Sequence, residues 1–118
     1  MNNKEKIAYT IAHKKAVITT YRKIVGYVPL SGYLHDLDKV ILLKIGINQK
    51  TVKKIHRRIA KHHHWKTSKE KVLIEMVIDW ESSRFTKPDK PRTARQYLND
   101  CRPEMKGRIE PILDEFGF

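Results

Sequence analysis

The sequence contains little that could crosslink the chain or anchor it in a membrane. Its single cysteine, Cys101, cannot form an internal disulfide, which is typical of a reducing compartment. We expect Cys101 to be a buried small apolar residue rather than a nucleophile. No apolar run approaches the roughly 20 residues of a membrane-spanning helix, and the opening MNNKEK lacks the apolar core of a signal peptide. The sequence therefore predicts a soluble, cytoplasmic protein.

Acidic residues are also scarce, since 13 Asp and Glu stand against 25 Lys and Arg and give a formal net charge of +12. Such an excess of cations favours polyanionic partners such as nucleotides or nucleic acid, although a solvated lysine-rich surface has the same composition. Hydrophobic residues make up 40% and charged residues 32%, a globular balance. The length of 118 residues predicts one domain over residues 1–118.

No segment alternates apolar and polar residues as a half-buried strand does, and there is no internal repeat. Apolar residues instead recur every three or four positions, which predicts helices. The first covers about 4–25 and ends at Gly26. Ser31 is placed to cap a second helix that runs through His35 and Asp36 to about Ile45.

The remaining helices are predicted from their capping residues. Asn48 would cap a third helix that continues to the histidines near His62, and Thr67 with Glu70 forms a capping-box pattern before a fourth at about 68–83. After a basic loop at 84–92, Thr93 would cap a short helix and Pro103 would open the last. The predicted class is all-α, a compact single-domain bundle of five or six helices.

The histidines and acids stand in a distinctive order along these helices. His13 is followed by the pair His35–Asp36, then by His56, by the run 62–64, and by Asp79. Imidazole and carboxylate without thiolate suit borderline or hard divalent ions, here one or two of Mn, Fe, Co, Ni, Zn or Mg. Two ions a few ångströms apart would make a phosphoester-cleaving centre. Taken singly, the histidines could equally be surface residues of amphipathic helices.

The spacing leaves some of the ligand geometry open. Adjacent His35 and Asp36 diverge by about 100° on a helix, so an ion between them would have to lie over the helix wall. His56 and His63 are seven residues apart and share a face if the third helix persists that far. His62 could replace or assist His63, and spacing alone does not choose between them.

Further residues are candidates for catalysis and for phosphate binding. Glu75 lies four residues before Asp79 and is either a partner of a ligand histidine or a general base. Lys39 follows Asp36 by one helical turn and could meet a phosphate or pair with a carboxylate. With the metal-binding Asp36, these two form the predicted catalytic set. The candidate phosphate ligands are Arg57, Arg58, Arg84 and Lys87.

The string H-D-L-D-K at 35–39 resembles the H-D-x-x-K signature of the HD superfamily of metal-dependent phosphohydrolases, with His13 before it and Asp79 after it in the order of that superfamily. The blocks H-K-K-A-V, H-R-R-I-A-K-H-H and E-M-V-I-D-W add a resemblance to small HD-like proteins of bacteria and phages over about residues 10–85. Two positions depart from that family: Asp38 replaces a common serine and Ala60 a common asparagine. Either departure could alter substrate recognition.

The resemblance implies an HD-domain-like fold, one metal on His13, His35, Asp36 and Asp79, and a second metal on His56 with His62 or His63. It also implies a metal-dependent phosphohydrolase that acts on a nucleotide or another small phosphoester. Two alternatives stay open. Some binuclear HD proteins resemble di-iron oxygenases. The net charge and the basic segment 84–95 are also compatible with a protein that binds nucleic acid or an acidic partner and has a structural or vestigial metal site.

Overall fold

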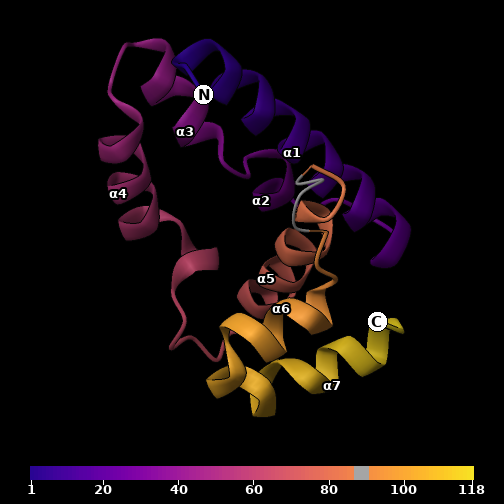
Figure 1. Cartoon of the computed structure of the whole chain (residues 1–118). Coiled ribbons are helices and arrows are strands. Elements are labelled where there is room, and N and C mark those ends of the chain that lie inside the picture. Colours follow the sequence, from indigo (N-terminus) through magenta and orange to yellow (C-terminus); the bar gives the residue numbers. More distant parts are fainter. Residues whose placement is uncertain (87–90) are drawn as a thin grey trace.

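The computed structural model describes residues 1–86 and 91–118, and within these ranges the chain is helical and without strands (Figure 1). The predicted all-α class is therefore confirmed. The helices are α1 (Asn3–Ile24), α2 (Leu30–Tyr33), α3 (Leu37–Lys44), α4 (Gln49–Ile59), α5 (Glu70–Ser83), α6 (Ala94–Cys101) and α7 (Lys106–Phe116), with 3₁₀ turns η1 (Lys61–His63) and η2 (Pro103–Met105). In the described part of the chain, none of these helices combines the length and the apolar character needed to cross a membrane.

Helix α5 is the centre of the arrangement. One apolar face packs with α6, η2 and α7 in a core that includes Trp80, Leu98 and Ile109. A second face packs Ile78 against Val17 and Tyr21 of α1, which is joined on another side by α2 and α3. Helix α4 stands farther from this core and reaches α5 through η1 (Figure 1). Burial of apolar side chains on α5 therefore fixes this helix against α1, α6 and α7.

Capping residues explain where several helices begin. Asn48 accepts a hydrogen bond from the Thr51 backbone N–H at the start of α4, and Thr93 forms a capping box with Gln96 at the start of α6, as predicted. The predicted box of Thr67 and Glu70 is wrong. Thr67 Oγ1 instead accepts from the backbone N–H of Lys69, and α5 begins at Glu70 without a side-chain cap.

The predicted second helix is wrong, because it is divided into α2 and α3. The break lies at His35 and Asp36, where Asp36 has φ of 57°, the one positive φ of a non-glycine residue in the described ranges. A left-handed conformation costs about 1–2 kcal/mol for most residues, and aspartate is among those that adopt it most readily. The apolar spacing continues across the break, so periodicity alone does not reveal it.

The predicted third helix is too long. Helix α4 ends at Ile59, because Ala60 is extended with φ of −79° and ψ of 118°, and the chain then enters η1. His56 and His63 therefore do not share one helix face. They lie on two elements that meet at an angle, and this brings the imidazoles of residues 56, 62 and 63 together.

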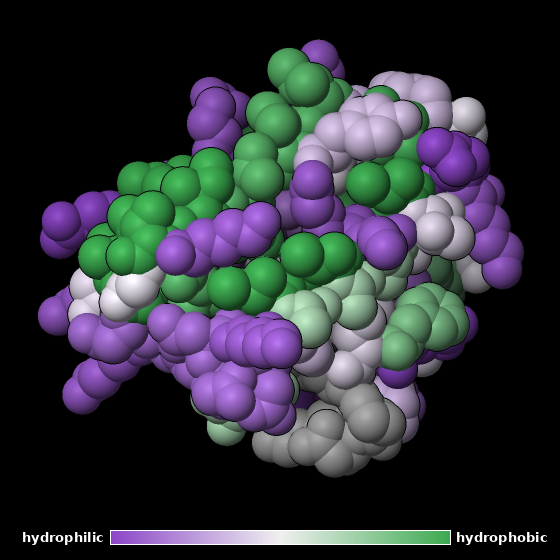
Figure 2. Space-filling model, turned by 90° about the horizontal axis from the view of Figure 1, so that it is seen from above, coloured by the Kyte–Doolittle hydropathy of each residue, from purple (hydrophilic) through white to green (hydrophobic). Residues whose placement is uncertain are grey.

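The outer surface is not uniformly polar. Large apolar side chains on α2, α3 and the turn after it are exposed, including Leu30 at 72% and Ile45 at 68%. Figure 2, seen from above Figure 1, shows a broad hydrophobic area bordered by hydrophilic side chains. The described part thus combines a basic surface with an apolar one.

Candidate metal centre

Histidine and carboxylate side chains from five segments meet in one buried cluster. The segments are α1, the break between α2 and α3, α4, η1 and α5. They contribute three overlapping groups of donor atoms, each group with its atoms within 4.8 Å of one another: His13, His35, Asp36 and Asp79; His56, His62 and His63; and His35, His62 and Glu75. These groups could hold a metal ion.

The first group is centred on Asp79 of α5. Its Oδ1 lies 2.7 Å from His13 Nε2 and 2.9 Å from His35 Nε2. Asp36 Oδ2 faces the same two imidazoles, at 3.6 Å from His35 Nε2 and 4.0 Å from His13 Nε2. Four donor residues from three separate segments therefore converge on one point between α1 and α5.

The second group is reached by the other oxygen of the same carboxylate. Asp36 Oδ1 lies 3.0 Å from His56 Nε2 and 3.3 Å from His62 Nε2. Asp36 has a left-handed backbone conformation at the N-cap position of α3, and its side chain makes no capping hydrogen bond to that helix. Asp36 is the residue that connects the two groups.

Two further carboxylates contact the Nδ1 atoms of the imidazoles and orient the rings. Asp38 Oδ2 lies 2.8 Å from His56 Nδ1, and Glu75 Oε2 lies 2.8 Å from His62 Nδ1 and 3.2 Å from His35 Nδ1. Carboxylates of this kind fix the tautomer of a ligand histidine and raise its basicity. Asp38 was not predicted as a site residue. Its contact joins α3 to α4, and no spacing along the chain indicates such a pair.

The burial of these charges shifts their pKa values. Burial alone would lower the pKa of His35 and His62, but hydrogen bonds to carboxylates outweigh it and raise the pKa of His35 to about 10 and of His62 to about 9. Burial would raise the pKa of Asp36, Asp79 and Glu75, but bonds to the histidines hold the pKa of both aspartates well below the usual range and that of Glu75 near 2. In the metal-free cluster, protonated His35 and His62 are thus favoured beside ionised carboxylates.

The donor set fits a divalent metal. Nε2 of His56 and Nε2 of His62 face each other at 3.3 Å, while Nδ1 of each ring meets a carboxylate. In the neutral form that binds metal, each ring carries its hydrogen on Nδ1, so both Nε2 atoms are acceptors and cannot bond to each other. Asp36 Oδ1 lies 3.0 Å and 3.3 Å from these two nitrogens, so in the neutral rings three acceptor atoms face one another. A cation between these atoms would satisfy all three.

A cavity of about 520 Å³ opens onto the cluster. His13, Asp36, His56, His63 and Asp79 line it on one side. The cations of its lining are Lys6, Lys39, Lys53 and Arg57. Lys39 Nζ also lies 3.6 Å from Asp36 Oδ2, as the one-turn spacing predicted. The cavity thus has buried carboxylates and imidazoles on one side and positively charged side chains around them.

His62 and His63, the two predicted alternatives for the second group, have different surroundings. His62 lies between Asp36 and Glu75, whereas His63 lines the cavity and meets the Trp65 ring edge-on at 5.4 Å between centroids. Burial lowers the pKa of His63 to about 3, and the neighbouring His62 acts in the same direction. His63 is therefore a neutral imidazole beside the second group, and His62 is the more central member.

Not every predicted site residue reaches this cavity. Arg57 lines it, but the exposed Arg58 and Arg84 are not part of its described lining. Arg84 Nε instead pairs with Glu81 Oε2 at 2.8 Å and lines a different cavity. Lys87 lies outside the described residues.

Of the two roles predicted for Glu75, its contacts favour that of a partner of ligand histidines over that of a general base. Glu75 is not part of the described lining of the cavity, and its low pKa makes it a weak base. Its contacts with His35 and His62 support the other predicted alternative, that of a residue which orients ligand histidines.

We expect Glu75→Gln to weaken metal binding by about 10- to 100-fold, because the amide cannot supply a charge to both Nδ1–H groups. Titration against a chromophoric chelator measures this affinity. Glu70→Gln, at the exposed first turn of the same helix, is the matched control and should bind metal like the wild type. Equal affinity in the Glu75 variant would contradict an orienting role.

Comparison of the chain with protein-family models, curated proteins and solved structures finds no match. Any function must therefore be inferred from the buried histidine and aspartate groups themselves. These groups could hold a metal ion, and their placement joins residues that lie up to 66 positions apart in the chain.

Proposed function

We propose that this protein is a metal-dependent phosphohydrolase that acts on a nucleotide or another small phosphoester. The observation that carries the proposal is the position of Asp36, whose two carboxylate oxygens face two separate groups of histidines. A carboxylate between two such groups is suited to a pair of ions. The resemblance to the HD superfamily agrees with this ligand set, and membership of that superfamily is part of the proposal.

The residues that would hold the first ion are His13, His35, Asp36 and Asp79, and those that would hold the second are His56 and His62 with Asp36, His63 being adjacent. With so many imidazoles, we expect transition ions such as Mn²⁺, Fe²⁺ or Zn²⁺ rather than Mg²⁺. Bound ions of this kind supply Lewis acidity and a water of lowered pKa.

The chain's own residues would bind and orient the phosphoester. Lys39 lines the cavity and is held beside Asp36, so its ammonium group is placed to meet an oxygen of a phosphoryl group next to the metal ligands. Lys53 and Arg57 extend the positive charge along the same cavity and could bind further phosphates. Trp80 and Tyr97 provide apolar wall for the rest of the substrate.

The proposed activity is tested by loading the chelated protein with Mn²⁺, Fe²⁺ or Zn²⁺ and incubating it with nitrophenyl phosphate esters and nucleoside phosphates. We expect release of phosphate or nitrophenolate that depends on the added ion and is absent from the chelated protein. Absence of hydrolysis across the whole series, in protein shown to carry two ions per chain, would contradict the proposal. Oxygen consumption by the iron-loaded protein would instead favour the oxygenase alternative.

We expect Lys39→Gln to lower kcat/KM by about 10- to 100-fold, since a hydrogen bond to a charged group is worth roughly 1.5–3 kcal/mol. Steady-state kinetics on the best substrate of the series measures the effect. Lys44→Gln removes the same charge from the exposed end of the same helix and should leave kcat/KM unchanged. Equal losses in the two variants would indicate a general effect of net charge instead.

A further inference from the structure

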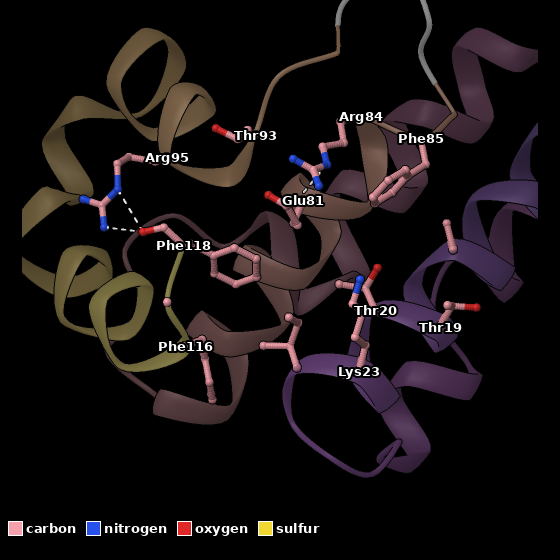
Figure 3. Close-up of a pocket in the computed structure, with 13 residues that line it drawn as sticks. Thr19, Thr20, Lys23, Glu81, Arg84, Phe85, Thr93, Arg95, Phe116 and Phe118 are labelled. Carbon is pink, nitrogen blue, oxygen red and sulfur yellow. Dashed lines mark hydrogen bonds and ion pairs between the residues drawn. The ribbon is translucent and has the colours of Figure 1, made fainter.

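A second cavity, of about 730 Å³, lies apart from the histidine cluster. Its walls come from the C-terminal half of α1, the end of α5 with the turn after it, the start of α6, and the C-terminal residues 116–118 (Figure 3). None of the histidines or carboxylates of the metal centre belongs to its described lining. The volume falls within the range of about 300–1,000 Å³ that small-molecule pockets occupy.

The walls of this cavity are mainly apolar. Ala16 and Ile24 contribute from α1, Phe85 from the turn after α5, and Phe116 and Phe118 from the C-terminal end. Figure 3 shows the rings of Phe118 and Phe85 on different sides of the cavity. Such walls can bury the hydrocarbon or aromatic part of a ligand, which is the main favourable contribution to binding in a preformed pocket.

The polar groups of the lining are predominantly cationic. Lys23, Arg84 and Arg95 stand against one carboxylate, Glu81. Arg95 is already engaged, because its Nη2 donates to Asp114 Oδ1 at 2.8 Å and to the Phe118 carbonyl oxygen at 2.7 Å. For Lys23 no ion pair is found within the described ranges of the chain, and its side chain is exposed at the rim.

Arg84 is held in place while most of its guanidinium group stays available. Its Nε donates to Glu81 Oε2 at 2.8 Å, and its Cζ lies 4.7 Å from the centre of the Phe85 ring. Glu81 is itself fixed, being 4% exposed and accepting a hydrogen bond from the Ala94 backbone N–H at 3.0 Å. Within residues 1–86 and 91–118 the Nη1 and Nη2 groups of Arg84 have no hydrogen-bonded partner. A guanidinium fixed through Nε presents two parallel donors to an acid group.

We propose that this cavity is a second ligand site, which binds a small amphiphilic anion. The carboxylate or other acid head of the ligand bonds to Arg84, with Lys23 contributing charge, and its apolar body lies against Phe85, Phe118 and Ile24. A neutral apolar molecule would leave the fixed guanidinium without a hydrogen-bond acceptor. An inorganic anion would leave the apolar walls in contact with water. The site is independent of the metal centre and does not rest on the proposed hydrolase activity.

Octanoate is a suitable probe, and 1-octanol is its uncharged counterpart of the same chain length. We expect octanoate to bind with a stoichiometry of one in calorimetry, and at least about tenfold more tightly than 1-octanol, because the acid head makes charge-assisted hydrogen bonds. In ¹H–¹⁵N spectra of the wild type, the amide shifts should change at Ala16, Thr20 and Phe118 and stay unchanged at His35 and His62.

Two variants test the two parts of the proposed site. Arg84→Gln should weaken octanoate binding at least about tenfold without affecting 1-octanol. Ala16→Phe should block both ligands by filling the cavity. Arg22→Gln and Ala12→Phe make the same changes at exposed positions of α1 outside the described lining, and should bind like the wild type.

Three results would overturn the proposal. One is the absence of saturable octanoate binding by the wild type up to about 1 mM, because we expect the dissociation constant to lie below that concentration. Another is an equal loss in Arg84→Gln and Arg22→Gln, which would indicate only general attraction to a basic surface. The third is a set of shifted amides around the histidine cluster. Because the amide shifts are measured on the wild type, the test stands even if a variant fails to fold.

Discussion

Replacement of Asp36 by asparagine is expected to abolish the binding of both metal ions and to lower phosphoester hydrolysis at least about a thousandfold. Asp36 is the one described residue whose two carboxylate oxygens each face a different group of histidines. Asparagine adopts the left-handed backbone at φ of 57° about as well as aspartate, so the variant removes the charge and keeps the fold. Alanine would add backbone strain to the loss of the ligand.

The controls for this variant come from the same segment. Asp38→Asn removes a carboxylate two residues away that contacts the outer nitrogen of His56, so we expect weaker binding at the second group and retention of the first ion. Calorimetric titration with Mn²⁺ or Zn²⁺ counts the sites, and far-ultraviolet circular dichroism checks the fold. An Asp36→Asn protein that folds, binds two ions and turns over at the wild-type rate would contradict the account.

The second large effect concerns the metal-free protein, which should lose stability as pH rises from 7 to 9. The pKa of His35 is about 10 and that of His62 about 9 in the folded chain, against about 6.5 when unfolded. A raised pKa contributes stability that is fully present below pH 6.5 and is lost as pH rises through the folded value. A tenfold difference in proton affinity between the folded and unfolded chain corresponds to about 1.4 kcal/mol, so the free energy of unfolding should fall by several kcal/mol over this range.

This pH dependence opposes the effect of the net charge. Raising the pH lowers the net charge of +12, and weaker self-repulsion alone would stabilise the fold. Urea unfolding of chelated protein at pH 7 and pH 9 measures the balance. His62→Gln should reduce the loss of stability, and bound metal should remove it, because metal binding displaces the protons. Greater stability of the chelated wild type at pH 9 than at pH 7 would show that these histidines are not charged partners of the carboxylates.

The acid side of the stability profile follows from the carboxylates. The folded pKa of Glu75 is about 2, so its contribution is present above the unfolded value near 4 and is lost as pH falls toward 2. Asp36 and Asp79, whose pKa is also lowered, act in the same direction. The lowered pKa of His63 adds a contribution that is lost as pH falls below about 6.5. The metal-free protein should therefore be most stable near pH 6.5, between the acidic transitions of the carboxylates and His63 and the alkaline transition of His35 and His62.

The helical class and most helix ends could be predicted because they depend on local signals. Apolar spacing defined α1 and α5, and the caps at Asn48 and Thr93 act within one turn of chain. The break at Asp36 could not be predicted in this way, because it depends on a left-handed backbone that tertiary contacts hold in place. The end of α4 at Ile59 was missed because the following residues, Ala60 and Lys61, do not interrupt helices by themselves.

The members of the cluster were easier to predict than its geometry. The resemblance to the HD superfamily grouped His13, His35, Asp36 and Asp79, and the structure brings their donor atoms within 4.8 Å of one another. The outer contact of Asp38 with His56 joins two helices and has no sequence signal. Arg84 was grouped with the site only because it is basic, whereas its pairing with Glu81 one turn earlier on the chain holds it at the other cavity.

The metal content of the protein purified without a histidine tag shows whether the histidine and carboxylate cluster is a two-ion centre. Inductively coupled plasma mass spectrometry on the protein as isolated, and after loading with Mn²⁺, Fe²⁺ or Zn²⁺ and removal of excess ion, gives the number of ions per chain. We expect two transition-metal ions per chain, which are lost on treatment with a strong chelator. A chain that retains no ion after loading with any of the three would contradict the two-ion centre.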